Sequence, residues 1–203
     1  VFRTRPATTT RSGAWFFAVT PPAAEKAPAA AEVLGHAKVS AICFGCTGGS
    51  FVKPGYDQEI IDAMVGATKI PSTTTSTAIN EALKYLGIKS VAIASPYPPW
   101  LNDRLAKFLE DSGFTVVSKK GLDVECPAYL PPDNAYRIAT ETNCREADAV
   151  LISCTNFRSL EVIEEWEKDL GKPVVSSNTA SMWKLLQLSG SKDKVKGAGQ
   201  LFK

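Results

Sequence analysis

Two short stretches decide the fold of this chain: VSAICFGCT at residues 39–47 and AVLISCT at residues 149–155. Each is an apolar run typical of a buried parallel strand, and each ends in a Cys-Thr pair. The pairs Cys46-Thr47 and Cys154-Thr155 are both followed by a turn and an amphipathic helical pattern. The two stretches therefore look like copies of one strand–cysteine–helix unit.

The similarity continues downstream, where residues of the two halves match at one fixed offset. The matching pairs are Pro71/Pro173, Thr74/Ser176, Thr75/Ser177, Thr77/Thr179, Ala78/Ala180, Leu83/Leu185 and Leu86/Leu188. Agreement at a single offset indicates a diverged internal repeat. The repeat predicts two similar halves with a pseudo-twofold relation, each presenting one cysteine at the carboxyl end of a strand.

The rest of the chain alternates apolar runs with helical patterns of about ten residues, which predicts an α/β fold with parallel sheets. Strands are expected at 39–44, 90–94, 115–118, 149–153 and 174–176. Helices are expected at 29–37, 57–67, 77–86, 100–111, 135–145, 160–170 and 180–188, with a Pro-rich loop at 126–133.

Composition excludes several classes of protein. Of 203 residues, 44% are hydrophobic and 22% charged, which is ordinary for a globular protein and excludes a mainly disordered chain. The net charge is only +2 and no basic block stands out, so neither nucleic acid nor a membrane surface is an expected partner. Five cysteines and no secretory signal favour reduced thiols in the cytoplasm. The single histidine, His36, excludes a mechanism that needs two.

The opening segment, residues 1–24, is rich in Arg and Thr and has no acidic residue before Glu25. This composition fits a transit peptide. It also fits the remnant of a longer chain, and the apolar run at 14–19 favours the remnant because it is typical of a folded segment.

The carboxyl ends of parallel strands are where α/β folds place ligands. A cysteine there meets free backbone N–H groups and the positive end of a helix dipole, which lower the pKa of a thiol and favour the thiolate. The residues that follow, Thr47 and Gly48 in the first half and Thr155 and Asn156 in the second, suit a cradle for an anion. Two facing cradles would hold a small dicarboxylate between two cysteines, for two-sided proton transfer or thiolate addition. The alternative is inert packing, since free cysteine is often buried.

Two further features leave alternatives open. Cys43 and Cys46 spell CxxC, which is typical of redox or zinc sites, but no second CxxC or second histidine completes a metal site. A redox motif wants a helix starting within CxxC, whereas Gly48-Gly49 follows here. Tyr97 follows the strand SVAIAS, either as a turn aromatic over the core or with its hydroxyl directed into the cleft.

Five stretches together resemble the aspartate/glutamate racemase superfamily. Within it they are most similar to the branch of maleate cis-trans isomerase and arylmalonate decarboxylase. They are CTGGSF (46–51), IPSTTTSTAINEAL (70–83), VAIASPYPPWLNDRLAKFLEDSGF (91–114), LISCTNFRSLEVIEEWEKDLGKPVVSSN (151–178) and a closing GAGQLF.

The resemblance implies two half-domains, each a short parallel sheet flanked by helices, with the active site between them. It implies cofactor-independent chemistry alpha to a carboxylate, and often a homo-oligomer. By resemblance, Cys46 and Cys154 are the acid/base or nucleophile pair, Thr47 and Thr155 with nearby amides form the carboxylate cradle, and Tyr97 binds a substrate carboxylate. Decarboxylases of this branch keep only the second cysteine, so the presence of both points to an isomerase or racemase.

The halves are expected to comprise residues 1–85 plus 179–203 and residues 86–178, with the last helix crossing back to the first half. From the resemblance we expect the family's first strand-and-helix unit to be missing before Val1, and residues 125–130 lack the asparagine of the isomerase branch. The expected activity is that of a maleate cis-trans isomerase. The alternatives are an aspartate/glutamate-type racemase, an arylmalonate decarboxylase-like enzyme, an inactive relic of the fold and a CxxC thiol-redox protein.

Overall fold

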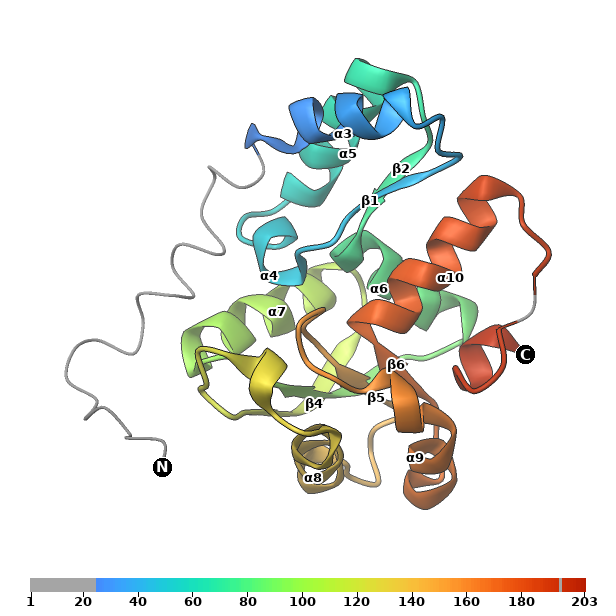
Figure 1. Cartoon of the computed structure of the whole chain (residues 1–203). Coiled ribbons are helices and arrows are strands. Elements are labelled where there is room, and N and C mark those ends of the chain that lie inside the picture. Colours follow the sequence, from blue (N-terminus) through green and yellow to red (C-terminus); the bar gives the residue numbers. More distant parts are fainter. Residues whose placement is uncertain (1–24, 194) are drawn as a thin grey trace, which may run out of the picture.

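The computed structural model describes residues 25–193 and 195–203, in which helices alternate with strands of two parallel sheets (Figure 1). The apolar run at 14–19 lies outside the described residues. The α/β class and the short parallel sheets flanked by helices are thus as the sequence predicts.

The first sheet has two parallel strands, in which Ile42 lies opposite Ser72. Its elements are α3 (Ala27–His36), β1 (Ile42–Phe44), α4 (Thr47–Ser50), α5 (Tyr56–Thr68), β2 (Ser72–Thr74) and α6 (Thr75–Tyr85). Helices α3 and α5 pack against each other and against these strands (Figure 1). The two helices and strand β1 together form a small core of buried apolar side chains, which are Ala27, Ala31, Ile42, Tyr56, Ile60 and Met64.

The second sheet has four parallel strands in the order β4-β3-β5-β6. Its elements are β3 (Ser90–Ser95), α7 (Pro99–Asp111), β4 (Thr115–Gly121), a 3-10 turn (Pro127–Tyr129), α8 (Pro132–Thr142), β5 (Ala149–Ile152), a 3-10 turn (Leu160–Val162), α9 (Ile163–Leu170), β6 (Val174–Ser176), α10 (Ser177–Ser189) and a final 3-10 turn (Gln200–Phe202). Helix α7 covers one face of the sheet, whereas α8 and α9 cover the other (Figure 1).

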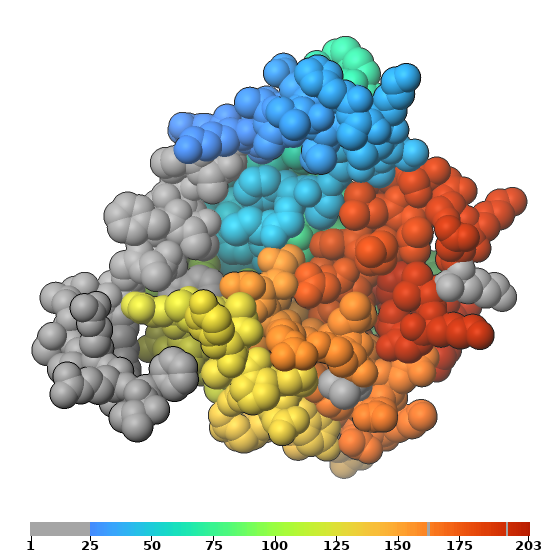
Figure 2. Space-filling model, in the orientation of Figure 1, coloured from blue at the N-terminus to red at the C-terminus, as the bar shows by residue number. Residues whose placement is uncertain are grey.

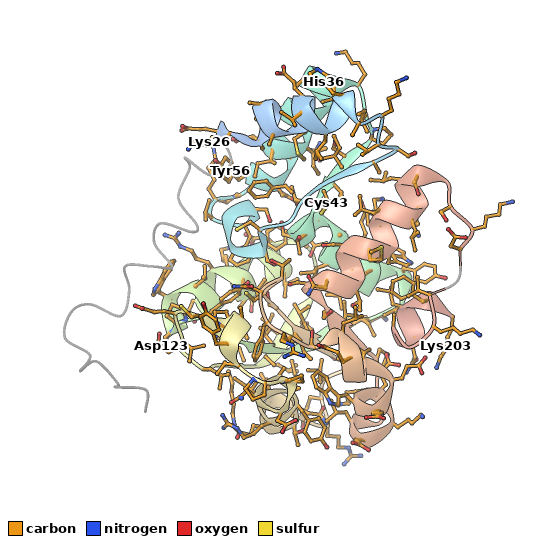
Figure 3. All side chains as sticks on the ribbon, in the orientation of Figure 1. Lys26, His36, Cys43, Tyr56, Asp123 and Lys203 are labelled. Atoms are coloured by element: carbon orange, nitrogen blue, oxygen red, sulfur yellow. The ribbon has the colours of Figure 1, made fainter. Side chains whose placement is uncertain are left out.

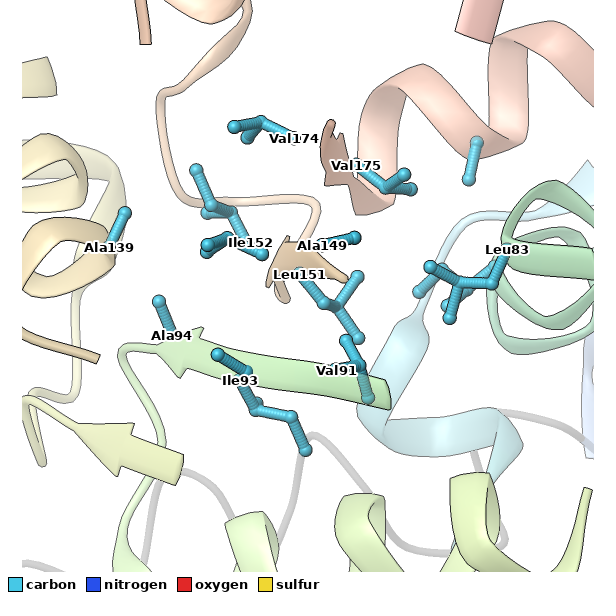
Figure 4. Close-up of a cluster of buried hydrophobic side chains, with 14 of the residues drawn as sticks. Leu83, Val91, Ile93, Ala94, Ala139, Ala149, Leu151, Ile152, Val174 and Val175 are labelled. Carbon is cyan, nitrogen blue, oxygen red and sulfur yellow. The ribbon is translucent and has the colours of Figure 1, made fainter. Parts of the chain in front are cut away.

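The central strands β3 and β5 form the middle of a second, larger core (Figure 4). All four residues of β5 are fully buried, as are Val91 to Ala94 of β3. A strand covered by helices on both faces has no polar side, which is why these segments read as unbroken apolar runs.

The repeat appears in matching strand-to-helix junctions. Thr74 ends β2 and its hydroxyl accepts the N–H of Thr77, while Ser176 ends β6 and accepts the N–H of Thr179. The two helices that start there, α6 and α10, pack against each other, and α10 also contacts β1 and β2. The division into residues 1–85 plus 179–203 and 86–178 stays a prediction.

Several boundaries differ from those expected. The helix predicted at 135–145 begins earlier, at Pro132, because proline fits the first turn of a helix, and it ends at Thr142. Strand β2 reads Ser-Thr-Thr and carries no apolar signal, and the single turn α4 is too short to show periodicity. Among the described residues, no helix is long and apolar enough to cross a membrane.

Glu167 ties the C-terminal segment to the second sheet. Its buried carboxylate accepts the backbone N–H groups of Val174 at 3.1 Å and Gln200 at 2.9 Å. Glu167→Ala leaves both donors without an acceptor, so we expect the free energy of unfolding to fall by about 3 kcal/mol. Urea titration followed by circular dichroism measures this. Glu167→Gln keeps one carbonyl acceptor and is expected to lose less; an equal or larger loss would contradict the explanation.

Candidate active site

Cys46 lies two residues beyond the end of β1 and precedes the single turn α4. Its backbone is extended, at φ −124° and ψ 98°, which directs the chain from the strand into the turn. The backbone N–H of Gly49 donates to the Cys46 thiol. A Cβ at Gly49 would lie 3.0 Å from the Cys46 sulfur, so a larger residue there would require the thiol to shift by a few tenths of an ångström.

Cys154 occupies the matching position beyond β5, with Ser153 between strand and cysteine. It is 8% exposed, and its φ of 121° is in the left-handed region that a side chain rarely adopts. The backbone N–H of Asn156 and the hydroxyl of Tyr97 hydrogen-bond to its thiol. The thiol of a residue with a strained backbone thus bonds to a tyrosine from the loop after β3.

Tyr97 is the residue on which both halves converge. It follows β3 and is 1% exposed. Its hydroxyl accepts a hydrogen bond from the Ser153 hydroxyl at 3.3 Å and also bonds to Thr47 and Cys154. Burial raises the pKa of Tyr97 well above its ordinary value, and negative charge on Cys154 and, to a smaller extent, on Cys46 raises it further.

The backbone of Tyr97 is held from two sides. Its N–H donates to the Ser95 hydroxyl at 3.0 Å, and Ser95 in turn donates to Asn102 at 2.7 Å. Gly121, the last residue of β4, lies directly against the Tyr97 carbonyl and the Asn102 amide, with no room for a Cβ. These contacts fix the position of the Tyr97 backbone, from which its side chain extends.

A hydrogen bond also joins the loops of the two cysteines directly, from the hydroxyl of Thr155 to the carbonyl of Gly45 at 2.9 Å. The Cys154 loop is further held by α10, where the side-chain amide of Asn178 donates to the carbonyl of Thr155 at 3.1 Å. On the face shown in Figure 2, cyan atoms near residue 50 meet orange atoms of the segment around residue 155. The loops that carry Cys46 and Cys154 are thus in direct contact, and the placement of an active site between two half-domains stays a prediction.

The pKa values correct one prediction. Burial raises the pKa of the Cys46 thiol above its ordinary value, although the Gly49 N–H lowers it. Burial also raises the pKa of Cys154 to about 11, against the opposing bonds from Asn156 and Tyr97. The expectation of lowered thiol pKa values is wrong, because the hydrogen bonds to each thiol do not offset the loss of solvation on burial. The two thiols are nonetheless unequal, with the larger shift at Cys154.

Cys43 belongs to a different environment from Cys46. It lies within β1 (Figure 3), where its sulfur is 4.0 Å from the Thr75 hydroxyl and hydrogen-bonds to Ser181. Thr75 and Ser181 belong to α6 and α10, so Cys43 contacts this pair of helices. The Cys46 thiol instead contacts the backbone of α4. All five cysteines are free thiols. Among the described residues, no group of three or more His, Cys, Asp or Glu side chains is placed to hold a metal ion.

The remaining predicted residues take different positions. Gly48 is buried within α4, and Asn156 is exposed and contributes its backbone N–H to Cys154. Three residues near the site, Ser95, Gly121 and Ser153, were not identified from the sequence, because single serines and glycines at strand ends are common. In the sequence, Ser177 could be singled out only as the repeat equivalent of Thr75.

Comparison with known proteins places the chain in a family. The arylmalonate decarboxylase family profile matches residues 21–202. The chain is 36% identical to the arylmalonate decarboxylase of Bordetella bronchiseptica over 146 residues, which are 69% of this chain and 61% of that protein. It is 28% identical to the maleate isomerase of Nocardia farcinica over 188 residues, 88% of this chain and 72% of the relative.

The fold agrees with this similarity. A crystal structure of a liganded arylmalonate decarboxylase variant superimposes with a TM-score of 0.86 at 30% identity, covering 91% of this chain and 83% of that one. Because the family profile matches nearly the whole chain and both sequence and fold are similar to those of a named member, the chain belongs to the arylmalonate decarboxylase family.

Proposed function

We propose that this protein is a cofactor-independent isomerase of a small dicarboxylate, with maleate as the leading substrate. The observation that carries the proposal is that the buried hydroxyl of Tyr97 bonds both to Cys154 and to Thr47, the residue that follows Cys46. A reacting carbon placed there would have a thiol on each side. The similarity to a maleate isomerase over 88% of the chain supports the same substrate.

In the proposed reaction the Cys46 thiolate adds to one alkene carbon and forms a carbon–sulfur bond. The π electron pair moves to the neighbouring carbon, which takes a proton from the Cys154 thiol. The single bond between the two carbons then rotates. The Cys154 thiolate takes the proton back, the double bond re-forms in the trans geometry and the Cys46 thiolate leaves, so no net proton or electron is consumed.

The unequal thiols support this assignment of roles. Cys154 has the higher pKa, about 11, and therefore remains a thiol that can donate a proton, while Cys46 loses its proton first. Thr47, Gly48 and Tyr97 would bind one carboxylate of the substrate. Thr155 and the backbone N–H of Asn156 would bind the other, exchanging their bonds to the Gly45 carbonyl and the Cys154 thiol for bonds to the carboxylate.

A second candidate is decarboxylation of an arylmalonate, favoured by the 36% identity to a relative of that name. Two cysteines rather than one favour isomerisation over this reaction. A racemase of small amino acids is the third candidate, because paired thiols also serve two-sided proton transfer.

The deciding experiment is a proton NMR screen of the purified chain in D2O with maleate, aspartate, glutamate and an arylmalonate. We expect the maleate signal to be replaced by that of fumarate. Loss of carbon dioxide from the arylmalonate, or exchange of the alpha proton of an amino acid, would replace the proposal by one of the alternatives. No change in any sample would indicate an inactive relic.

The dependence of rate on pH tests the two roles. The rate requires Cys46 without its proton and Cys154 with it, so kcat/KM is expected to be bell-shaped. Because burial raises the pKa of Cys46, the rising limb lies at alkaline pH, and the falling limb lies near pH 11 where Cys154 loses its proton. Initial rates from fumarate absorbance in overlapping buffers measure this. An optimum below neutral pH would contradict the assignment.

Two further parts of the proposal concern context. Five free thiols support a reducing compartment such as the cytoplasm. A homo-oligomer is proposed from the family resemblance, and light scattering on a size-exclusion column measures the mass.

A further inference from the structure

Ser177 lies between the two cysteine loops. It is the first residue of α10 and is completely buried, at 0% exposure. Its hydroxyl oxygen accepts the backbone N–H of Cys154 at 2.9 Å and the hydroxyl of Thr47 at 3.0 Å. One oxygen atom thus joins a loop of the second half to a loop of the first.

The repeat does not account for this arrangement. Thr75 occupies the corresponding place at the start of α6, but its hydroxyl accepts from Ser181 at 3.0 Å and lies 3.4 Å from the carbonyl of Phe44. Thr75 thus serves the contact between α6 and α10. Only Ser177 of this pair bonds to the two loops that carry the thiols.

The backbone of Cys154 needs such a restraint. At φ 121° it adopts a conformation that persists only where surrounding contacts hold it. The bond from the Cys154 N–H to Ser177 is one such contact, and it acts on the residue whose thiol bonds to Tyr97 and to the Asn156 N–H. Loss of the Ser177 oxygen would therefore loosen the bonds that favour the Cys154 thiolate.

We propose that Ser177 is a positioning residue that holds the Cys154 backbone and the Thr47 hydroxyl in one frame, so that groups from both halves act on one substrate. The expected effect of Ser177 on turnover rests on the proposed function. The expected effect of Ser177 on the reactivity of the Cys154 thiol does not, because alkylation of Cys154 is measured without substrate.

The test compares Ser177→Ala with Ser177→Thr, which keeps the hydroxyl. Iodoacetamide labelling of Cys154 is followed by mass spectrometry over a pH series. Ser177→Ala is expected to shift the pH midpoint of labelling upward and to slow labelling at least about threefold below that midpoint, since rate follows the thiolate fraction. Ser177→Thr is expected to restore the parent profile. Ser177→Cys replaces alanine if the alanine variant does not fold, with the same expected shift, because sulfur is a weak acceptor.

Ser181→Ala is the matched control, one turn further along α10 with a hydroxyl that bonds to Thr75 instead. It is expected to leave the Cys154 profile unchanged. With maleate, Ser177→Ala is expected to lower kcat about tenfold or more, and Ser177→Thr to recover it.

Alanine and cysteine variants that label like the parent would overturn the proposal, whatever their thermal midpoints. A parent chain that turns over no substrate would overturn the proposed function, while the labelling profile still decides the role of Ser177.

Discussion

Cys46→Ala and Cys154→Ala are each expected to reduce maleate isomerisation at least about a thousandfold, which corresponds to roughly 4 kcal/mol of transition-state stabilisation. Without Cys46 no sulfur is placed to form the bond that frees the alkene for rotation. Without Cys154 no thiol is placed to protonate the neighbouring carbon. Fumarate formation followed by absorbance measures both variants, with the labelling of the remaining cysteine as evidence of a folded site.

Cys43→Ser is the control, since Cys43 contacts Thr75 and Ser181 rather than the site. We expect it to retain most of the parent rate. A large loss in Cys43→Ser together with a disulfide between Cys43 and Cys46 under mild oxidant would favour the thiol-redox alternative. Rates within about tenfold of the parent in both alanine variants would exclude the proposed mechanism.

Gly121→Ala is expected to have the largest effect of any substitution outside the site. A Cβ at this position would overlap the Tyr97 carbonyl and the Asn102 amide, and a backbone carbonyl cannot swing away as a flexible side chain can. Overpacking of this kind costs about 3 kcal/mol. Because the displaced carbonyl belongs to Tyr97, we also expect the isomerase rate to fall by about a hundredfold, measured beside the urea unfolding midpoint.

Gly66→Ala is the matched control for this substitution. Gly66 lies within α5, and a Cβ there would meet nothing within 4 Å. Alanine favours the helix, so this variant is expected to be as stable as the parent or slightly more so. Equal stability and equal rates in Gly121→Ala and Gly66→Ala would show that neither folding nor turnover depends on the close approach of Gly121 to the Tyr97 carbonyl.

The sequence was sufficient for the parts of the fold that depend on periodicity. The buried strands β3 and β5 and the amphipathic helix α7 lie within a few residues of their predicted positions. The composition of the polar strand β2 gave no strand signal, yet the offset that pairs Thr74 with Ser176 makes β2 the repeat equivalent of the predicted strand at 174–176. An internal repeat therefore carries information that local propensity lacks.

The site was predicted less completely, for physical reasons. A strand-end cysteine is visible in sequence, but the loss of solvation that raises its pKa depends on what covers it. The bonds from Ser177 join residues far apart in the chain, and the close approach of Gly121 to Tyr97 depends on the register between neighbouring strands. Such contacts exist only after packing.

The two separate cores have a consequence for how the protein loses activity. In the described residues, the core beneath β1 and α5 buries six apolar side chains, far fewer than the core around β3 and β5. The free energy of local opening follows the apolar surface that each region buries, so we expect α3, β1 and α5, next to the Cys46 loop, to open first. Amide hydrogens of α3 and α5 should then exchange with solvent sooner than those of β5. Turnover would disappear while the second sheet is still folded, and the working limit of the protein is the stability of its smaller half.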